Sequence, residues 1–519
     1  MRSGLRAVVR ASPLPAGAAL LLSAACSSNS GALPTGHPSA DAAATDGAGA
    51  ITDAGAAPEA SSSNADGSAA ETGVSDAKAN ALTCIPGWAH CSGDAVDVCE
   101  TDLGQPGNCG SCGNECAVTA LCVGAPASRA CARPVAIATA YQASFALFSN
   151  GTLEAWGGTP GSGSLLGYGN AAVTMFADPL VVDAPSATAI AAGYAHACAV
   201  LSNETVACWG DNSFGQLGVE LAADGGTPFV PGLEIGDGQG TATPTVVAGL
   251  SNVTAIAAGV THTCALLSGG TVECWGSNDY GELGTTLSTS CNGGVDTCSP
   301  TPTPVPGLSN VTAIAVGGDG IQDADHTCAL LSGGTIECWG YNADGELGNG
   351  TETTSSGPGP VSNVTNAIAV TAWSAGGCAL ISGGEVQCWG LNDDGELGDG
   401  ITTSSSTPVA VSGLSDAVAL STSSTSATIC AARSDGSAVC WGAGSHGKLG
   451  TGSGDSGADS TSPVVVDGLT NVSALAAGLQ QTCAIAWGGV YCWGYDGDGE
   501  VGNTSADPDY NGRPLAVQW

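Results

Sequence analysis

The chain has 519 residues, of which 43% are hydrophobic and 80 are glycine, a composition typical of a turn-rich β protein without long helices. Nine Lys and Arg residues face 47 Asp and Glu residues, so the formal net charge is −38. A surface this acidic repels phosphate backbones and anionic lipid headgroups, and we therefore expect neither nucleic acid nor a bare membrane as a partner. The charge does not argue against a cationic partner.

The first 26 residues combine three arginines, a short apolar run and small residues ahead of Cys26, which is the pattern of an export signal. They resemble a bacterial lipoprotein signal. This resemblance implies that residues 1–25 are removed, that Cys26 carries the lipid, and that Ser27 directs the protein to the outer membrane. An ordinary cleaved signal with a free Cys26, and hence a secreted protein, is the alternative. No later stretch is long and apolar enough to span a bilayer.

Two segments precede the repetitive part of the chain. Residues 26–82 contain mainly Ala, Ser, Gly, Asp and Thr, and they bury too little apolar surface to offset their ordering entropy, so we predict a disordered tether. Residues 83–133 contain eight cysteines, and removing Cys26 leaves an even total of 22. We predict disulfides in this segment, because an exported chain meets oxidising conditions. Zinc ligation with His90 nearby is the alternative, and the connectivity stays open.

One unit repeats from residue 134 to residue 519. Seven Trp-Gly pairs, at 156, 209, 275, 339, 389, 441 and 493, are separated by 50 to 66 residues. A strand-like run such as ATAIAAG precedes each pair, and in most units a glycine-punctuated loop such as SNDYGELG follows it. Several short strands per unit at this period are typical of a β-propeller. The sequence therefore predicts an all-β fold with seven blades in a closed ring.

Two cysteines recur ten residues apart in front of most Trp-Gly pairs. In CALLSGGTVEC the hairpin centre falls on Gly269, which places Cys264 directly opposite Cys274. Opposed residues of antiparallel strands have Cα separations that a disulfide can bridge. The first unit has Phe145 and Ala155 at these positions, so both cysteines are absent together.

This pairing extends to the other units. In the seventh unit the cysteines are nine apart, and the loop between them is one residue shorter. By the chain-entropy estimate, closing an 11-residue loop stabilises the fold by about 2.8 kcal/mol. The predicted pairs are Cys198–Cys208, Cys264–Cys274, Cys328–Cys338, Cys378–Cys388, Cys430–Cys440 and Cys483–Cys492, with Cys291–Cys298 as a further pair in an insertion.

The unit HTCALLSGGTVECWGSNDYGELG, at 262–284, resembles the repeat of the regulator of chromosome condensation family. The resemblance covers about 134–519 and implies a seven-bladed β-propeller. The founding nuclear member promotes nucleotide exchange on a small GTPase and contacts chromatin. Neither role is expected here, because Arg433, Lys448 and Arg513 are the only basic residues of the propeller and the chain carries an export signal. Exported relatives, one an inhibitor of β-lactamase, act as protein-binding discs.

Three kinds of candidate site arise from the repeat. His196, His262 and His326 share one position in separate units, which favours structural hydrogen bonds over a common metal centre. The acidic loops 342–346, 392–396 and 496–500 offer oxygen ligands for calcium, but they coincide with the turn of the repeat, so we predict no metal and no cofactor. No motif for a catalytic nucleophile, zinc protease or phosphate loop is present, and we predict no catalytic residue.

Loop length separates the units from one another. Residues 219–244 and 285–303 extend the second and third units, and residues 318–325 are inserted in the fourth. Because extra loops on a rigid ring are where binding residues collect, we predict a monomeric binding protein that recognises an unknown protein or polysaccharide through these loops. The alternatives are a carbohydrate-active enzyme that uses paired carboxylates and a surface spacer without a ligand.

Overall fold

The computed structural model describes residues 121–123, 130–158, 165–168, 176–184, 186–219, 240–287, 289–291, 296–318, 324–422, 428–452, 457–503 and 510–519, together with two short strands, β1 (Trp88–Ala89) and β2 (Thr101–Asp102). The predicted signal, Cys26 and the tether lie outside these residues, as does most of the cysteine-rich segment. Among the described residues, no helix is long and apolar enough to cross a membrane.

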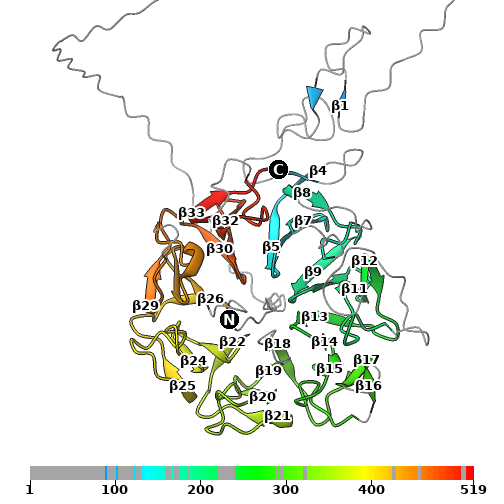
Figure 1. Ribbon diagram of the computed structural model, residues 1–519, viewed down its shortest axis with the longest axis vertical. Helices are drawn as coiled ribbons and strands as arrows, with labels where there is room; N and C mark the ends of the chain where they lie inside the picture. Colours follow the sequence, from blue (N-terminus) through cyan, green and yellow to red (C-terminus); the bar gives the residue numbers. More distant parts are fainter. Residues whose placement is uncertain are drawn as a thin grey trace, which may run out of the picture. The chain divides into compact units, whose positions relative to one another are not determined.

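Seven antiparallel sheets surround one axis, and each follows the chain from its innermost to its outermost strand (Figure 1). The predicted seven-bladed β-propeller is therefore confirmed. Blades 1 to 3 are β5 (Pro134–Thr139), β6 (Ala143–Phe148), β7 (Leu153–Gly157) and β8 (Phe176–Val181); β9 (Ala187–Ala192), β10 (His196–Leu201), β11 (Val206–Asp211) and β12 (Gly240–Val246); and β13 (Val253–Ala258), β14 (His262–Leu267), β15 (Val272–Ser277) and β17 (Asp296–Pro304), which also pairs with β16 (Ser290–Cys291).

Blades 4 to 7 keep the same order. They are β18 (Val311–Gly317), β19 (His326–Leu331), β20 (Ile336–Gly340) and β21 (Ser355–Pro360); β22 (Ala367–Trp373), β23 (Gly376–Ile381), β24 (Val386–Gly390) and β25 (Ser405–Ala410); β26 (Ala417–Thr422), β27 (Thr428–Arg433), β28 (Ala438–Gly442) and β29 (Ser460–Val465); and β30 (Val472–Ala477), β31 (Gln481–Ala486), β32 (Gly489–Tyr495) and β33 (Tyr510–Ala516). A 3-10 turn, η3 (Ser445–Gly447), follows β28.

Strand direction alternates within each blade, and this defines two ends of the ring. The turns after the first strand and the loops after the third strand lie at one end, which we call the loop face. The hairpins between the second and third strands and the connections between blades lie at the other end, the hairpin face. The three insertions singled out in the sequence follow β11, β15 and β18, so all three begin at the loop face.

Every Trp-Gly pair joins its blade to the preceding one. The seven indoles are buried, and each Nε1 donates a hydrogen bond of 2.7 to 2.9 Å to a carbonyl oxygen in the loop after the third strand of the preceding blade. The glycine that follows is required by close packing. At Gly276, with φ at +110°, an added Cβ would lie 2.4 Å from the carbonyl oxygen of Thr261. The repeated dipeptide is therefore the joint between blades.

The same joint closes the ring between blades 7 and 1. Trp156 Nε1 donates to the carbonyl oxygen of Glu500 at 2.9 Å. Trp519, near the last strand, packs edge-on against Phe148 and Trp156, with ring centroids 5.0 and 5.7 Å away. The core of this seam also includes Val123, from a hairpin formed by β3 (Leu121–Val123) and β4 (Ala130–Ala132). Part of the cysteine-rich segment therefore packs on the seam.

The blade hairpins place their cysteines in opposed pairs. Cys264 faces Cys274 across β14 and β15, and Phe145 faces Ala155 in the blade that lacks the pair. Six disulfides join Cys198–Cys208, Cys264–Cys274, Cys328–Cys338, Cys378–Cys388, Cys430–Cys440 and Cys483–Cys492. Cys298 is also in a disulfide, but the side chain of Cys291 lies outside the described part, so that pairing stays a prediction.

Candidate interaction face and its buried polar network

Histidines at the start of three second strands connect neighbouring blades. His196 Nε2 lies 2.8 Å from Thr263 Oγ1, and His262 Nε2 lies 2.9 Å from Thr327 Oγ1. His326 Nε2 lies 3.2 Å from a backbone oxygen of the next blade. All three rings are buried, and the predicted structural role of these histidines is confirmed.

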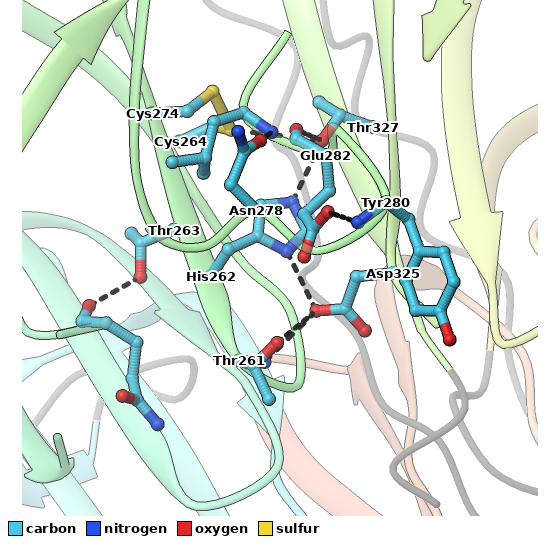
Figure 2. A network of polar contacts seen from close by, with 12 residues as sticks. Thr261, His262, Thr263, Cys264, Cys274, Asn278, Tyr280, Glu282, Asp325 and Thr327 are labelled. Atoms are coloured by element: carbon cyan, nitrogen blue, oxygen red, sulfur yellow. Dashed lines mark hydrogen bonds and ion pairs between the residues drawn. A yellow bond between two sulfur atoms is a disulfide. The ribbon is translucent and has the colours of Figure 1, made fainter. Parts of the chain in front are cut away.

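Asp325 adds a carboxylate to the joint between blades 3 and 4 (Figure 2). Its Oδ2 accepts hydrogen bonds from His262 Nδ1 at 2.8 Å, from the backbone nitrogen of Thr261 at 3.0 Å and from Thr261 Oγ1 at 3.2 Å. Asp325 and His262 are fully buried. Because Asp325 ends the insertion 318–325, this contact fixes the end of an inserted loop to the preceding blade. The sequence indicated the insertion but not this role of Asp325.

Thr327, His262 and Asp325 are connected in the order of a nucleophile, base and carboxylate triad, but their protons are placed differently. Thr327 Oγ1 donates its single proton to the carbonyl oxygen of Glu282 at 2.9 Å. His262 Nε2 must therefore donate to this hydroxyl, whereas a catalytic base must accept from it. Since all three side chains are also buried, the network joins blades and presents no nucleophile to a substrate.

A glutamate lies inward in several loops of the loop face. Glu282 Oε2 accepts a hydrogen bond of 2.8 Å from the backbone nitrogen two residues before it, and Glu396 and Glu500 repeat this contact at 2.9 Å. Burial raises the pKa of Glu282 to about 7 and the pKa values of Glu396 and Glu500 to about 8. In blade 2, the neutral side chain of Gln216 makes the same turn contact. The glutamates therefore occupy a position that an uncharged amide also fills, and their contacts stabilise their own loops.

The acidic loops considered for calcium therefore turn one carboxyl group inward. Among the described residues, no group of three or more His, Cys, Asp and Glu side chains could hold a metal ion. The buried glutamates also belong to separate blades, each bonded within its own loop, which is not the facing pair of carboxylates that a glycosidase needs.

Exposed carboxylates lie on both faces, including Asp183, Glu204 and Glu385 on the hairpin face, whereas the basic side chains are distributed unevenly. In the described turns and loops of the loop face, Lys448 is the one basic residue besides histidine, and it is fully buried with its Nζ donating to the carbonyl oxygen of Leu479 at 3.2 Å. Burial lowers the pKa of Lys448 to about 7. Exposed or half-buried carboxylates remain on this face at Asp279, Asp344, Glu352, Asp393, Asp394, Asp399, Asp459 and Asp498.

The aspartates that pair with arginine among the described residues belong to the opposite face, but Arg513 of β33 also lies beside Gly452, in the loop after β28. Arg433 pairs with Asp416 and Asp435, and Arg513 pairs with Asp467. All three aspartates lie in hairpins or connections of the hairpin face. The described loops of the loop face therefore contain several carboxylates and no exposed Lys or Arg side chain of their own, and Arg513 approaches them from β33.

Tyrosines gather on the loop face together with these carboxylates. Tyr141 stacks on Tyr194, and Tyr280 meets Tyr341 edge-on, both with ring centroids 4.9 Å apart. His446 lies 5.5 and 5.4 Å from the rings of Tyr495 and Tyr510. Six of the chain's eight tyrosines take part in these contacts, and each is half-buried. Each cluster joins different strands or blades, which is why the sequence did not reveal it.

Fold and face together define a disulfide-stapled propeller with one acidic, tyrosine-rich end. The family model described as the regulator of chromosome condensation (RCC1) repeat matches residues 205–266, 270–330 and 435–485, and a second model of this repeat matches 187–216 and 253–282. The chain therefore contains RCC1 repeats. Yeast RCC1 (Prp20), in a crystal structure with Kap60, aligns with a TM-score of 0.56 and 20% identity over 74% of this chain and 85% of that one.

Human WBSCR16 aligns with the same TM-score and 21% identity, over 67% of this chain and 86% of that one. Both structures show the fold alone. Among curated proteins, the chain is 29% identical to the ultraviolet-B receptor UVR8 of Arabidopsis thaliana over 34% of each chain. It is 28% identical to the secretion-regulating guanine nucleotide exchange factor of Bos taurus, over 44% of this chain and 48% of the relative. It spans 4% of mouse HERC2, an E3 ubiquitin-protein ligase, at 28% identity.

Proposed function

We propose that the propeller is a binding protein whose loop face recognises a cationic protein. The observation that carries this proposal is the coincidence of carboxylates with half-buried tyrosines on one face. Tyrosine is enriched where protein interfaces bury surface, since its ring supplies contact area and its hydroxyl group a hydrogen bond. Carboxylates favour a partner of opposite charge and speed its encounter at low salt.

A protein partner is also supported by what similar propellers are known to contact. Yeast RCC1 was crystallised in complex with another protein, Kap60. The activities named for the curated relatives do not carry over, because the chain spans less than half of each relative described above. The sequence also allowed a polysaccharide ligand, and the experiment below distinguishes it from a protein.

Two triple variants with the same loss of charge test the proposal. The loop-face variant combines Asp279→Asn, Glu352→Gln and Asp393→Asn. Its matched control combines Asp183→Asn, Glu204→Gln and Glu385→Gln, which are equally exposed but lie on the hairpin face.

Both variants and the wild type are used for affinity capture from the native envelope and culture medium at low salt. We expect basic proteins that bind the wild type and the control and are lost from the loop-face variant. Equal capture by both variants would reject the loop face as the binding surface. Bound material that resists protease and contains sugar would reject a protein partner in favour of a polysaccharide.

We also propose that the protein is exported and anchored through a lipid on Cys26. This is supported by the sequence of residues 1–26 and by the six blade disulfides, which persist in oxidising compartments. Cys26→Ser should abolish incorporation of labelled fatty acid and release the exported protein from membranes. Equal labelling of the variant and the wild type would contradict the anchor.

A further inference from the structure

Turns from four blades meet around the ring axis at the loop face. The first strand of each blade is innermost, so the turn after it lies beside the ring axis, at a place that we call the channel mouth (Figure 1). There Tyr141 of blade 1 stacks on Tyr194 of blade 2, with ring planes 14° apart. Both rings pack against Val260 of blade 3 and Leu479 of blade 7. The result is an aromatic and apolar floor to which no single blade contributes more than one side chain.

Hydrogen-bond acceptors adjoin this floor. Asp498, in the loop after β32, accepts a hydrogen bond from Gln142 Nε2 at 3.3 Å through one carboxylate oxygen. Burial raises the pKa of Tyr141, and the nearby charges of Asp498 and Glu500 raise it further, so this phenol stays neutral beside the carboxylate. The channel mouth therefore offers rings and acceptors, and the basic group beside it, Lys448, is buried with its Nζ bonded to the carbonyl oxygen of Leu479.

From this geometry we infer that the channel mouth binds the guanidinium group of an arginine side chain presented by the partner, an inference that rests on the proposed function. The methylene stem lies against Tyr141 and Tyr194, and the N–H groups reach the carboxylate of Asp498. Guanidinium fits this set better than ammonium does, because it is planar, stacks on aromatic rings and carries five donors and no acceptor.

The test compares two short Gly/Ser peptides that differ at one residue, arginine or citrulline, which has nearly the same shape without the charge. Binding to the full-length exported protein is measured by ligand-observed NMR titration. We expect the arginine peptide to bind about tenfold more tightly, as for a hydrogen-bonded charged group. Asp498→Asn should remove this difference. Asp344→Asn, which deletes the same charge from the loop of blade 4, should change the affinity less than twofold.

Tyr194→Leu provides a second variant, since it keeps an apolar side chain but removes the ring, and it should weaken the arginine peptide severalfold. Equal binding of both peptides to the wild type would overturn the inference. So would equal losses in Asp498→Asn and Asp344→Asn, which would show a diffuse acidic field without a pocket. That second result leaves the proposed function standing, whereas failure of the proposed function appears separately, as capture that is insensitive to the loop-face triple variant.

Discussion

Glu500→Gln tests whether the inward carboxyl groups of the loop face are neutral in the folded protein. Glu500 is buried, its Oε2 accepts a hydrogen bond from the backbone nitrogen of Asp498, and its Oε1 has no partner among the described residues. Burial raises its pKa to about 8, with a further increase from neighbouring carboxylates. Glutamine fits this position, because Gln216 makes the same turn contact in blade 2.

The sign and size of the effect follow from linkage. Above its ordinary pKa of 4.5, the side chain ionises in the unfolded chain but keeps its proton in the folded one. Folding stability therefore falls as the pH rises from 4.5 toward 8. At about 1.4 kcal/mol per pH unit, Glu500 alone lowers the free energy of unfolding by roughly 3 kcal/mol at pH 7. Glutamine does not titrate, so the variant does not lose this stability as the pH rises.

Urea unfolding with the disulfides intact, measured between pH 4 and pH 9, gives the difference in stability between Glu500→Gln and the wild type. This difference should shift in favour of the variant by roughly 3 kcal/mol between pH 4 and pH 7 and level off above about pH 8. Glu385→Gln, exposed on the hairpin face, should show no such shift. Parallel pH curves for Glu500→Gln and the wild type would mean that the folded protein holds this carboxyl group ionised, and the burial argument would be wrong.

Three further predictions concern the joints between blades and the disulfides within them. Trp156→Phe removes the indole hydrogen bond between blades 7 and 1 and should lower the free energy of unfolding by about 1–3 kcal/mol. Trp441→Phe removes the equivalent bond at an internal joint. A smaller loss for Trp156→Phe than for Trp441→Phe would mean that the closing joint is weaker than an internal one. Non-reducing peptide mapping should recover the six blade disulfides, and Cys264→Ala with Cys274→Ala should cost about 2–3 kcal/mol, whereas pairing between blades would contradict the hairpin register. Asp325→Asn should destabilise the protein by about 3 kcal/mol in urea unfolding, since it leaves the buried His262 ring, which donates through both nitrogens, without the carboxylate that accepts from Nδ1. A loss below about 1 kcal/mol would mean that the contact is unimportant.

The ring could be predicted from the sequence because the residues that fix its hairpins and blade contacts recur in nearly every unit. A hairpin centred on Gly269 fixes which residues are opposed, and the structure shows that register with Cys264 facing Cys274. The shorter loop of the seventh unit likewise becomes a two-residue turn at Trp487 and Gly488, both with positive φ. Periodicity in the sequence reports such local geometry directly.

The polar contacts were less predictable because they join residues far apart in the sequence. Asp325 meets His262 only because an insertion in one blade reaches the preceding blade. Glu346 belongs to the acidic loop 342–346, which offered oxygen ligands for calcium in the sequence, yet the turn directs its carboxyl group inward. Tyr141 and Tyr194 are ordinary turn residues until the ring brings their blades together. No local pattern encodes these three arrangements.

This difference bears on where recognition can be located in a repeat propeller. A surface built only from repeated residues presents seven similar patches, so selecting one partner in one orientation requires residues that break the repeat. On the hairpin face, blades 3 to 5 keep the same Ser-Gly-Gly tip at 268–270, 332–334 and 382–384. The tips of the other four blades differ by one or two residues or, in blade 7, by the exposed Trp487. The larger departures lie on the other face, where the three insertions begin, Lys448 replaces the inward glutamate, and the tyrosine pair spans the first two blades. Because these larger departures share a face with carboxylates and half-buried tyrosines, we expect the loop face to distinguish one partner from another.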